Sequence, residues 1–200
     1  SGCAHGPCGP RTTWGAANGV RSAIIARPRG LHAMSTSFPP PEASLPPDLA
    51  GRVILSTGAS GGLGAALAQS CGARRATVIL HGRAVRKLEE LYDRMMEADM
   101  PEPVILPLDL AKATADDFGN VASALQAQLG RLDGLVHMAA LLGSLGPIEH
   151  QSFDSWLSLL RVNVAAPMGL TRALMPLLNA SPDASVIFTL DNRGEQPRAY

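Results

Sequence analysis

The sequence predicts an α/β fold in which a doubly wound parallel sheet carries helices on both faces, giving three α/β/α layers. Short apolar runs of strand length alternate with longer segments of helical periodicity, and short turns join them. A glycine-rich turn lies between the first strand and the first helix. Because the connections between parallel strands are right-handed, the five expected strands favour the order 3-2-1-4-5.

The glycine-rich turn follows the apolar run 53–55 and contains Gly58, Gly61, Gly62 and Gly64. Glycine has no Cβ, so a phosphate group can approach the main chain closely. The first N–H groups of the following helix point at the same place, and the helix dipole adds partial positive charge there. Strand, glycine turn and helix in this order predict a site for a nucleotide diphosphate. The alternative is a tight strand–helix turn without a ligand.

The other elements follow from periodicity and from helix-ending residues. Thr114 and Ser152 are expected to cap two helices, Gly72 and Gly130 to end two, and Pro167 to kink the last. The expected strands after the first are 77–80, 104–106, 135–138 and 185–190, and the expected helices are 62–71, 85–98, 114–129 and 152–178.

The overall composition excludes several classes of partner. Lysine plus arginine number 17, as do aspartate plus glutamate, so the net charge gives no reason to expect nucleic acid. No apolar run approaches the roughly 20 residues that a membrane span needs. The three cysteines give no disulfide framework, and Cys3, His5 and Cys8 lack standard zinc spacing. We therefore expect no nucleic-acid partner, no membrane partner, no metal, and a cytoplasmic location.

The first 48 residues differ from the rest. No acidic residue precedes Glu42, while four arginines do, and proline clusters between residues 39 and 47. An arginine-rich, acid-free start is also compatible with a transit peptide. We expect residues 1–48 to be a disordered or non-native leader with a proline-rich linker. Residues 49–200 are then a nucleotide-binding domain that is incomplete at its C-terminal end.

From about residue 49 onward the chain resembles the classical short-chain dehydrogenases/reductases, whose sheet is of the Rossmann type. The segments that carry this resemblance are 57–64, 132–143, 161–164 and 174–178. The spacing of Gly58, Gly62 and Gly64 resembles the classical branch. That of Gly58, Gly61 and Gly64 resembles the extended branch, which acts largely on nucleotide sugars. Residues 137–140 also resemble the extended branch, but residues 162–164 and the helix that contains them follow the classical pattern.

The resemblance implies a nicotinamide dinucleotide as cofactor. Arg83 follows the second strand, where a base pairs with a 2′-phosphate and an acid would bind the ribose hydroxyls; this favours NADP(H) over NAD(H). Asp109 would accept from the adenine amino group, although it could also stabilise a turn. The positions that match the family's cofactor-binding residues are Gly58, Ser60, Gly62, Leu63, Gly64, Arg83, Asp109, Leu110 and Ala139.

The resemblance also implies an oxidoreductase that interconverts a carbonyl and an alcohol of a small molecule by hydride transfer, and that is a homo-oligomer when full length. Asn163 matches a catalytic asparagine whose carbonyl holds a water in a proton relay; the alternative is a polar residue that bonds its own helix. His137 lies in an apolar strand and is expected to be a core histidine. Met138 replaces the asparagine of the family's Asn-Ala-Gly.

The catalytic end departs from the family. Asp191 stands where a serine is expected, and Tyr200 is the last residue, so no lysine follows it. We expect a fragment without the Tyr-xxx-Lys pair, inactive and poorly soluble because the edge of strand 185–190 is open. Two alternatives remain open: a non-catalytic dinucleotide-binding domain, and an extended-type nucleotide-sugar epimerase or dehydratase.

Overall fold

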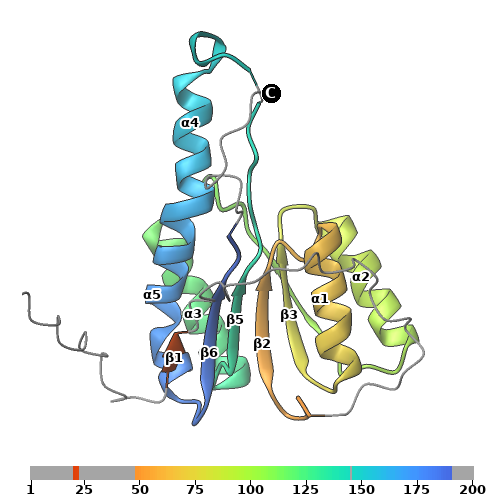
Figure 1. Ribbon diagram of the computed structural model, residues 1–200. Helices are drawn as coiled ribbons and strands as arrows, with labels where there is room; N and C mark the ends of the chain where they lie inside the picture. Colours follow the sequence, from red (N-terminus) through yellow and green to blue (C-terminus); the bar gives the residue numbers. More distant parts are fainter. Residues whose placement is uncertain (1–19, 23–47, 145, 191–200) are drawn as a thin grey trace, which may run out of the picture.

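The computed structural model describes residues 20–22, 48–144 and 146–190 of the 200. They form three layers, with helices on both faces of one parallel six-stranded sheet (Figure 1). The order across the sheet is β1-β6-β5-β2-β3-β4. The strands are β1 Val20–Ser22, β2 Val53–Thr57, β3 Thr77–Gly82, β4 Val104–Pro107, β5 Gly134–His137 and β6 Ala184–Phe188.

The predicted topology is confirmed. Without β1, the sheet reads β4-β3-β2-β5-β6 and every neighbouring pair is parallel, which is the expected order 3-2-1-4-5. All these strands therefore end at the same edge of the sheet. Strands β3 and β4 lie on one side of β2, and the chain then crosses to the other side to form β5 and β6. In parallel α/β sheets, ligands bind outside the carboxyl ends of the strands at the point where the strand order reverses in this way.

Two apolar clusters hold the layers together. One lies between the sheet and helices α1 (Gly62–Ala73) and α2 (Val85–Glu97), and includes Val78, Leu80 and Leu91. The other lies between the sheet and helices α3 (Ala115–Leu129) and α5 (Ala166–Asn179), and includes Leu55 and Leu135. Because both faces are covered, the strands are continuous apolar runs rather than alternating ones.

Most of the predicted helix ends are confirmed. Thr114 and Asp117 form a reciprocal capping box at α3, with the Asp117 carboxylate accepting from Thr114 N–H at 2.8 Å. Gly130 ends α3 in the left-handed region with φ 74°. Ser152 caps α4, accepting from Ser155 N–H at 3.5 Å.

Gly72 does not end its helix, so that prediction is wrong. Helix α1 runs one residue further, and the positive φ of 71° falls on Arg75. A Cβ at Gly72 would lie 2.7 Å from Met95 Cε and 2.9 Å from Met100 Sδ. The glycine is there because α1 packs closely on two methionine side chains, not because the backbone turns.

The long helix is interrupted where the kink was expected. Helix α4 (Phe153–Leu160) passes into a π turn, η2 (Arg161–Ala165), and then into α5; a short 3-10 turn, η1 (Ile148–His150), precedes α4. The π turn ends just before Pro167, which has no N–H to donate to the preceding turn. Leu160 of α4 and Val164 of η2 are exposed, whereas Leu170 of α5 is buried.

Strand β1 covers part of an edge that was expected to be open. Val20–Ser22 pairs in parallel with β6, from Ala184 to Val186. The expectation of an unpaired edge is therefore wrong at Ser185 and Val186. The other residues of the expected leader, up to 47, lie outside the described residues, and the division at residue 48 stays a prediction.

Candidate functional site

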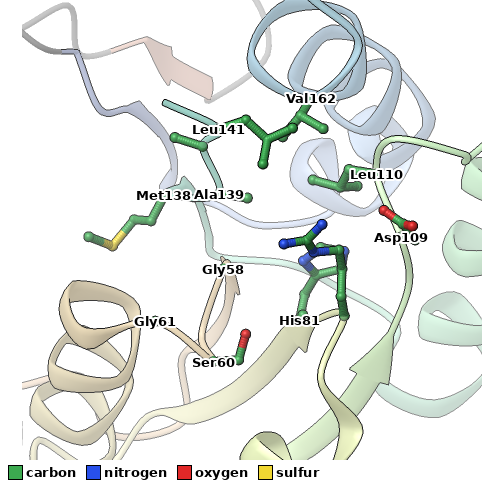
Figure 2. Close-up of a pocket in the computed structure, with 13 residues that line it drawn as sticks. Gly58, Ser60, Gly61, His81, Asp109, Leu110, Met138, Ala139, Leu141 and Val162 are labelled. Carbon is green, nitrogen blue, oxygen red and sulfur yellow. The ribbon is translucent and has the colours of Figure 1, made fainter. Parts of the chain in front are cut away.

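A cleft of about 230 Å³ lies where β2, β3 and β4 end, at the carboxyl edge of the sheet (Figure 2). Its walls come from the glycine turn after β2, the end of β3, the loop after β4, the segment after β5 and η2. The residues that line it are Gly58, Ser60, Gly61, His81, Gly82, Arg83, Asp109, Leu110, Met138, Ala139, Ala140, Leu141 and Val162.

The glycine turn forms a compact cradle that side chains would fill. Gly58 has φ +72°, and a Cβ there would lie 2.9 Å from the N and Cα of Ala139. A Cβ at Gly64, in the first turn of α1, would overlap the Gly58 carbonyl oxygen and lie 2.8 Å from its carbon. Helix α1 begins with no side-chain cap and no acidic residue in its first turn. Its N-terminal N–H groups are therefore left for an anion.

The structure brings together most of the predicted cofactor residues. Those that line the cleft are Gly58, Ser60, Arg83, Asp109, Leu110 and Ala139. Gly62, Leu63 and Gly64 do not line it: Gly64 is buried behind Gly58, and the Leu63 side chain is 70% exposed at the start of α1. These three residues therefore do not form the walls of the cleft. Gly64 instead allows the turn to pack closely against the start of α1.

Thr57 fixes the wall of the cleft that follows β5. Its hydroxyl accepts from Met138 N–H at 3.0 Å and from Ala139 N–H at 3.1 Å. The Met138 side chain points away from the cavity in Figure 2. A hydroxyl on β2 therefore holds this segment through its backbone, at the position where Met138 replaces the family's asparagine.

Asp109 stabilises a turn, as one of its two expected roles required. One carboxylate oxygen accepts from Ala111 N–H at 3.1 Å, and its backbone carbonyl accepts from Lys112 and Ala113 N–H. The second carboxylate oxygen makes no hydrogen bond to a described residue. The turn holds this carboxylate at the cleft and leaves one oxygen for a ligand.

Two buried histidines, His81 at the end of β3 and His137 at the end of β5, lie on opposite sides of β2 and differ in their surroundings. His137 Nε2 lies 2.9 Å from Thr171 Oγ1, and its ring stacks on Phe188 with centroids 4.8 Å apart, so the predicted core histidine is confirmed. His81 lines the cleft, and neither of its ring nitrogens has a hydrogen-bond partner among the described residues. Burial lowers the pKa of each to about 4, with the neighbouring His81 adding to the effect on His137.

His81 was not identified from the sequence as a site residue. The available signal was a polar residue at the end of an otherwise apolar strand, directly before Gly82 and Arg83. That position could as well have been an exposed strand end. Its burial depends on the packing around the cleft, which no local pattern reveals.

Asn163 lies in the π turn, and its side chain binds the segment after β5. Its side-chain oxygen accepts from Leu141 N–H at 2.8 Å, and its amide nitrogen donates to the Leu141 carbonyl at 2.9 Å. The alternative that it bonds its own helix is therefore wrong for the side chain. It lines a second hollow of about 620 Å³, with Trp156, Phe188 and Thr189, that shares residues 139–141 with the cleft.

The remaining catalytic expectations fall on Asp191 and Tyr200, outside the described residues. A further hollow of about 680 Å³ lies between the loop after β4 and α5, lined by Lys112, Phe118 and Arg172 among others, but it has no glycine cradle. Within residues 20–22, 48–144 and 146–190, no helix has the length and hydrophobicity to cross a membrane. The same residues contain no cluster of three or more His, Cys, Asp or Glu suited to a metal ion.

Comparison with known proteins identifies relatives for most of the chain. Residues 52–200 match the model of the short chain dehydrogenase family. Over 148 residues the chain is 38% identical to the uncharacterized oxidoreductase YciK of Escherichia coli K12, covering 74% of this chain. A crystal structure of a short chain dehydrogenase from Salmonella enterica serovar Typhi matches with TM-score 0.72 and 40% identity over 76% of this chain. A Shigella flexneri structure complexed with NADP matches with TM-score 0.73 and 38% identity over 76%.

The matches also fix how much of these relatives the chain represents. It spans 59% of YciK, 62% of the Salmonella protein and 63% of the Shigella protein. The matching residues include the sheet from β2 to β6, the glycine cradle and the residues that line the cleft. The comparisons support neither the nucleotide-sugar enzyme nor the non-catalytic domain. The chain belongs to the short chain dehydrogenase family.

Proposed function

We propose that this chain holds NADP(H) in the cleft and that the protein is an oxidoreductase interconverting a carbonyl and an alcohol of a small molecule. The observation that carries the proposal is the cradle in which Gly58 packs on both Gly64 and Ala139, with Arg83 at the adjoining strand end. The NADP complex of the Shigella flexneri relative supports the choice of ligand.

The residues of the cleft fit the parts of such a dinucleotide. The N–H groups at the start of α1 suit the pyrophosphate, and Ser60 of the glycine turn lines the cleft next to Gly82. The second oxygen of Asp109 can accept from the adenine amino group. Ala139 keeps the end of β5 open for the ribose. When bound, the cofactor supplies the hydride; the role of this part of the chain is to bind and orient it.

Arg83 is the residue proposed to select the phosphorylated cofactor. It follows β3 directly, lines the cleft, and makes no ion pair with any described residue. No acidic residue lies at the end of β3 that could bind both ribose hydroxyls. A guanidinium group presents a fork of donors that matches a phosphate. The same site therefore favours a 2′-phosphate and disfavours the bare diol.

Replacing Arg83 with Ala is expected to weaken NADPH binding by about tenfold or more and to leave NADH binding unchanged. A charge-assisted hydrogen bond contributes about 1.5–3 kcal/mol, and tenfold in affinity corresponds to about 1.4 kcal/mol. Arg83→Glu should reverse the preference. Fluorescence titration with both cofactors measures it. Arg86→Ala is the matched control, because Arg86 pairs with Glu90 on the exposed face of α2. Equal affinity of the parent for both cofactors would contradict the assignment.

For the chemistry we propose Asn163 as the residue that organises the substrate side. Its two hydrogen bonds to Leu141 fix the segment that borders both the cleft and the second hollow. The oxidoreductase proposal is tested on the whole protein by carbonyl-dependent oxidation of NADPH. A protein that binds NADPH tightly yet oxidises it with no ketone or aldehyde of a broad panel would favour a binding role instead.

Homo-oligomer formation and a cytoplasmic location belong to the same proposal. The support for an oligomer is the run of exposed apolar side chains on α4 and η2, where Phe153 is 75% and Val164 is 61% exposed. Burying such a surface against a second copy contributes about 25 cal/mol per Å². The support for the cytoplasm is a count of three cysteines, which gives no disulfide framework.

A further inference from the structure

His81 is a buried polar residue whose side chain has no hydrogen-bond partner among the described residues. It lies on β3 opposite Leu106 of β4, is 1% exposed, and neither Nδ1 nor Nε2 has a partner among the described residues. Figure 2 shows His81 at the end of β3, among the residues that line the cleft. Buried side-chain nitrogens almost always have a hydrogen-bond partner. Of the buried side-chain atoms without a partner among the described residues, only the two His81 nitrogens belong to a residue that lines the cleft, where a ligand could supply the partner.

The comparison with His137 separates this residue from an ordinary core histidine. Both rings are buried in the same sheet, and both are uncharged at neutral pH because burial lowers each pKa to about 4. His137 has a hydroxyl partner in Thr171 and a stacked ring in Phe188. His81 has neither, and of the two only His81 lines the nucleotide cleft.

We propose that His81 hydrogen-bonds the adenosine half of the bound dinucleotide, from the floor of the cleft; this rests on the proposed function. A neutral imidazole has one donor and one acceptor. Ribose hydroxyls and the adenine edge also donate and accept, whereas a phosphate only accepts. The position favours the same half: His81 lies on β3 opposite Leu106 of β4, and lines the cleft with Arg83 and Asp109, which follow these two strands.

The proposal has a signature that a structural role does not share. In the free protein the two unpartnered nitrogens cost stability, because they have lost water without gaining a partner. Leucine has a similar volume and no polar atom. His81→Leu should therefore raise the midpoint of urea unfolding in the absence of nucleotide and, at the same time, weaken nucleotide binding. A histidine that only fills space would show no loss of affinity.

The experiment uses the full 200-residue chain and three probes that compete with NADPH: AMP, 2′,5′-ADP and nicotinamide mononucleotide. The fluorescence of bound NADPH measures how much of it each probe displaces. For His81→Leu, we expect AMP and 2′,5′-ADP to bind about fivefold or more weakly, by similar factors, which is the size of one neutral hydrogen bond. Nicotinamide mononucleotide should be unaffected. Arg83→Ala, the comparison variant, should weaken 2′,5′-ADP alone. The two residues are thus separated by the 2′-phosphate.

The possible failures are distinguishable. If the parent chain binds neither NADPH nor AMP, the proposed function itself fails. If the parent binds both and His81→Leu binds AMP with unchanged affinity, only the inference about His81 is overturned. If His81→Leu does not fold, ¹⁵N spectra of the imidazole in the parent decide. A change in one ring-nitrogen shift on adding AMP supports the contact, and identical shifts with and without AMP overturn it.

Discussion

Replacing Gly64 with Ala is expected to abolish nucleotide binding and to lower the free energy of unfolding by about 3 kcal/mol, the upper part of the range for overpacking. The added Cβ would overlap the Gly58 carbonyl oxygen and come within 3.0 Å of Ala59 Cα. Both neighbours are backbone atoms, so no side chain can turn away to make room. The glycine turn must open, which moves Gly58 from its contact with Ala139.

Gly62→Ala is the matched control, because Gly62 lies in the same turn and begins the same helix. A Cβ there meets no atom within 4 Å. Alanine is the better helix former, so this variant should be as stable as the parent or slightly more stable. Urea unfolding and NADPH titration of both variants test the pair. If both alanine variants bind NADPH like the parent, the cradle is not the nucleotide site.

The second large effect is expected at Asp133, which directly precedes β5 and lies at the amino ends of the strands, away from the cleft. Its buried carboxylate accepts from Val53 N–H at 2.8 Å, from the Ser181 hydroxyl at 2.7 Å and from Arg131 Nε at 3.2 Å. It thereby ties the start of β2 to the loop before β6. Asp133→Ala should lower the free energy of unfolding by about 3 kcal/mol, because a buried amide and a hydroxyl lose their partner.

Asp183→Ala is the control for this substitution. The Asp183 carboxylate lies 3.5 Å from Arg52 Nη2, and the Asp183 side chain is 58% exposed. An exposed ion pair contributes about 0–1 kcal/mol, so this variant should unfold close to the parent. Similar losses in the two aspartate variants would show that the buried network is not what stabilises this edge.

The same carboxylate predicts a pH dependence. Burial acts to raise the Asp133 pKa, but the hydrogen bonds from Ser181 and Val53 and the charge of Arg131 outweigh it, and the pKa lies below its usual 3.8. A folded-state pKa below the unfolded one stabilises the protein above the unfolded value. That stabilisation is lost as the pH falls through the folded pKa. Urea unfolding from pH 6 to pH 2 should therefore show a shallower loss for Asp133→Asn than for the parent.

The sheet order and the cleft could be predicted because they depend on local patterns. Apolar runs of strand length and one glycine turn, together with right-handed crossovers, favour the observed arrangement over most others. The capping residues Thr114 and Gly130 act on their own neighbours, so their roles were visible too. The role of Gly72 was not, because it depends on Met95 and Met100, which approach it from other parts of the chain.

The site shows the same limit. Arg83 directly follows β3 and Asp109 comes two residues after β4, so parallel pairing alone brings them to one edge. The two hydrogen bonds of Asn163 to Leu141 depend on how η2 meets the segment after β5, which is 22 residues away in the sequence. The isolation of His81 and the pairing of β1 with β6 likewise depend on packing between distant segments. Tertiary contacts of this kind produce no periodic pattern in the amino-acid sequence, so they could not be predicted from it.

The central claim is that the cleft at the ends of β2, β3 and β4 holds a nicotinamide dinucleotide. Amide chemical-shift changes in ¹⁵N–¹H spectra on adding NADPH test it most directly. The account predicts the largest changes at Gly58, Gly61, Asp109, Leu110 and Ala139, and their loss in Gly64→Ala. Changes centred instead on Lys112, Gly119 and Arg172, around the larger hollow beside α5, would contradict it.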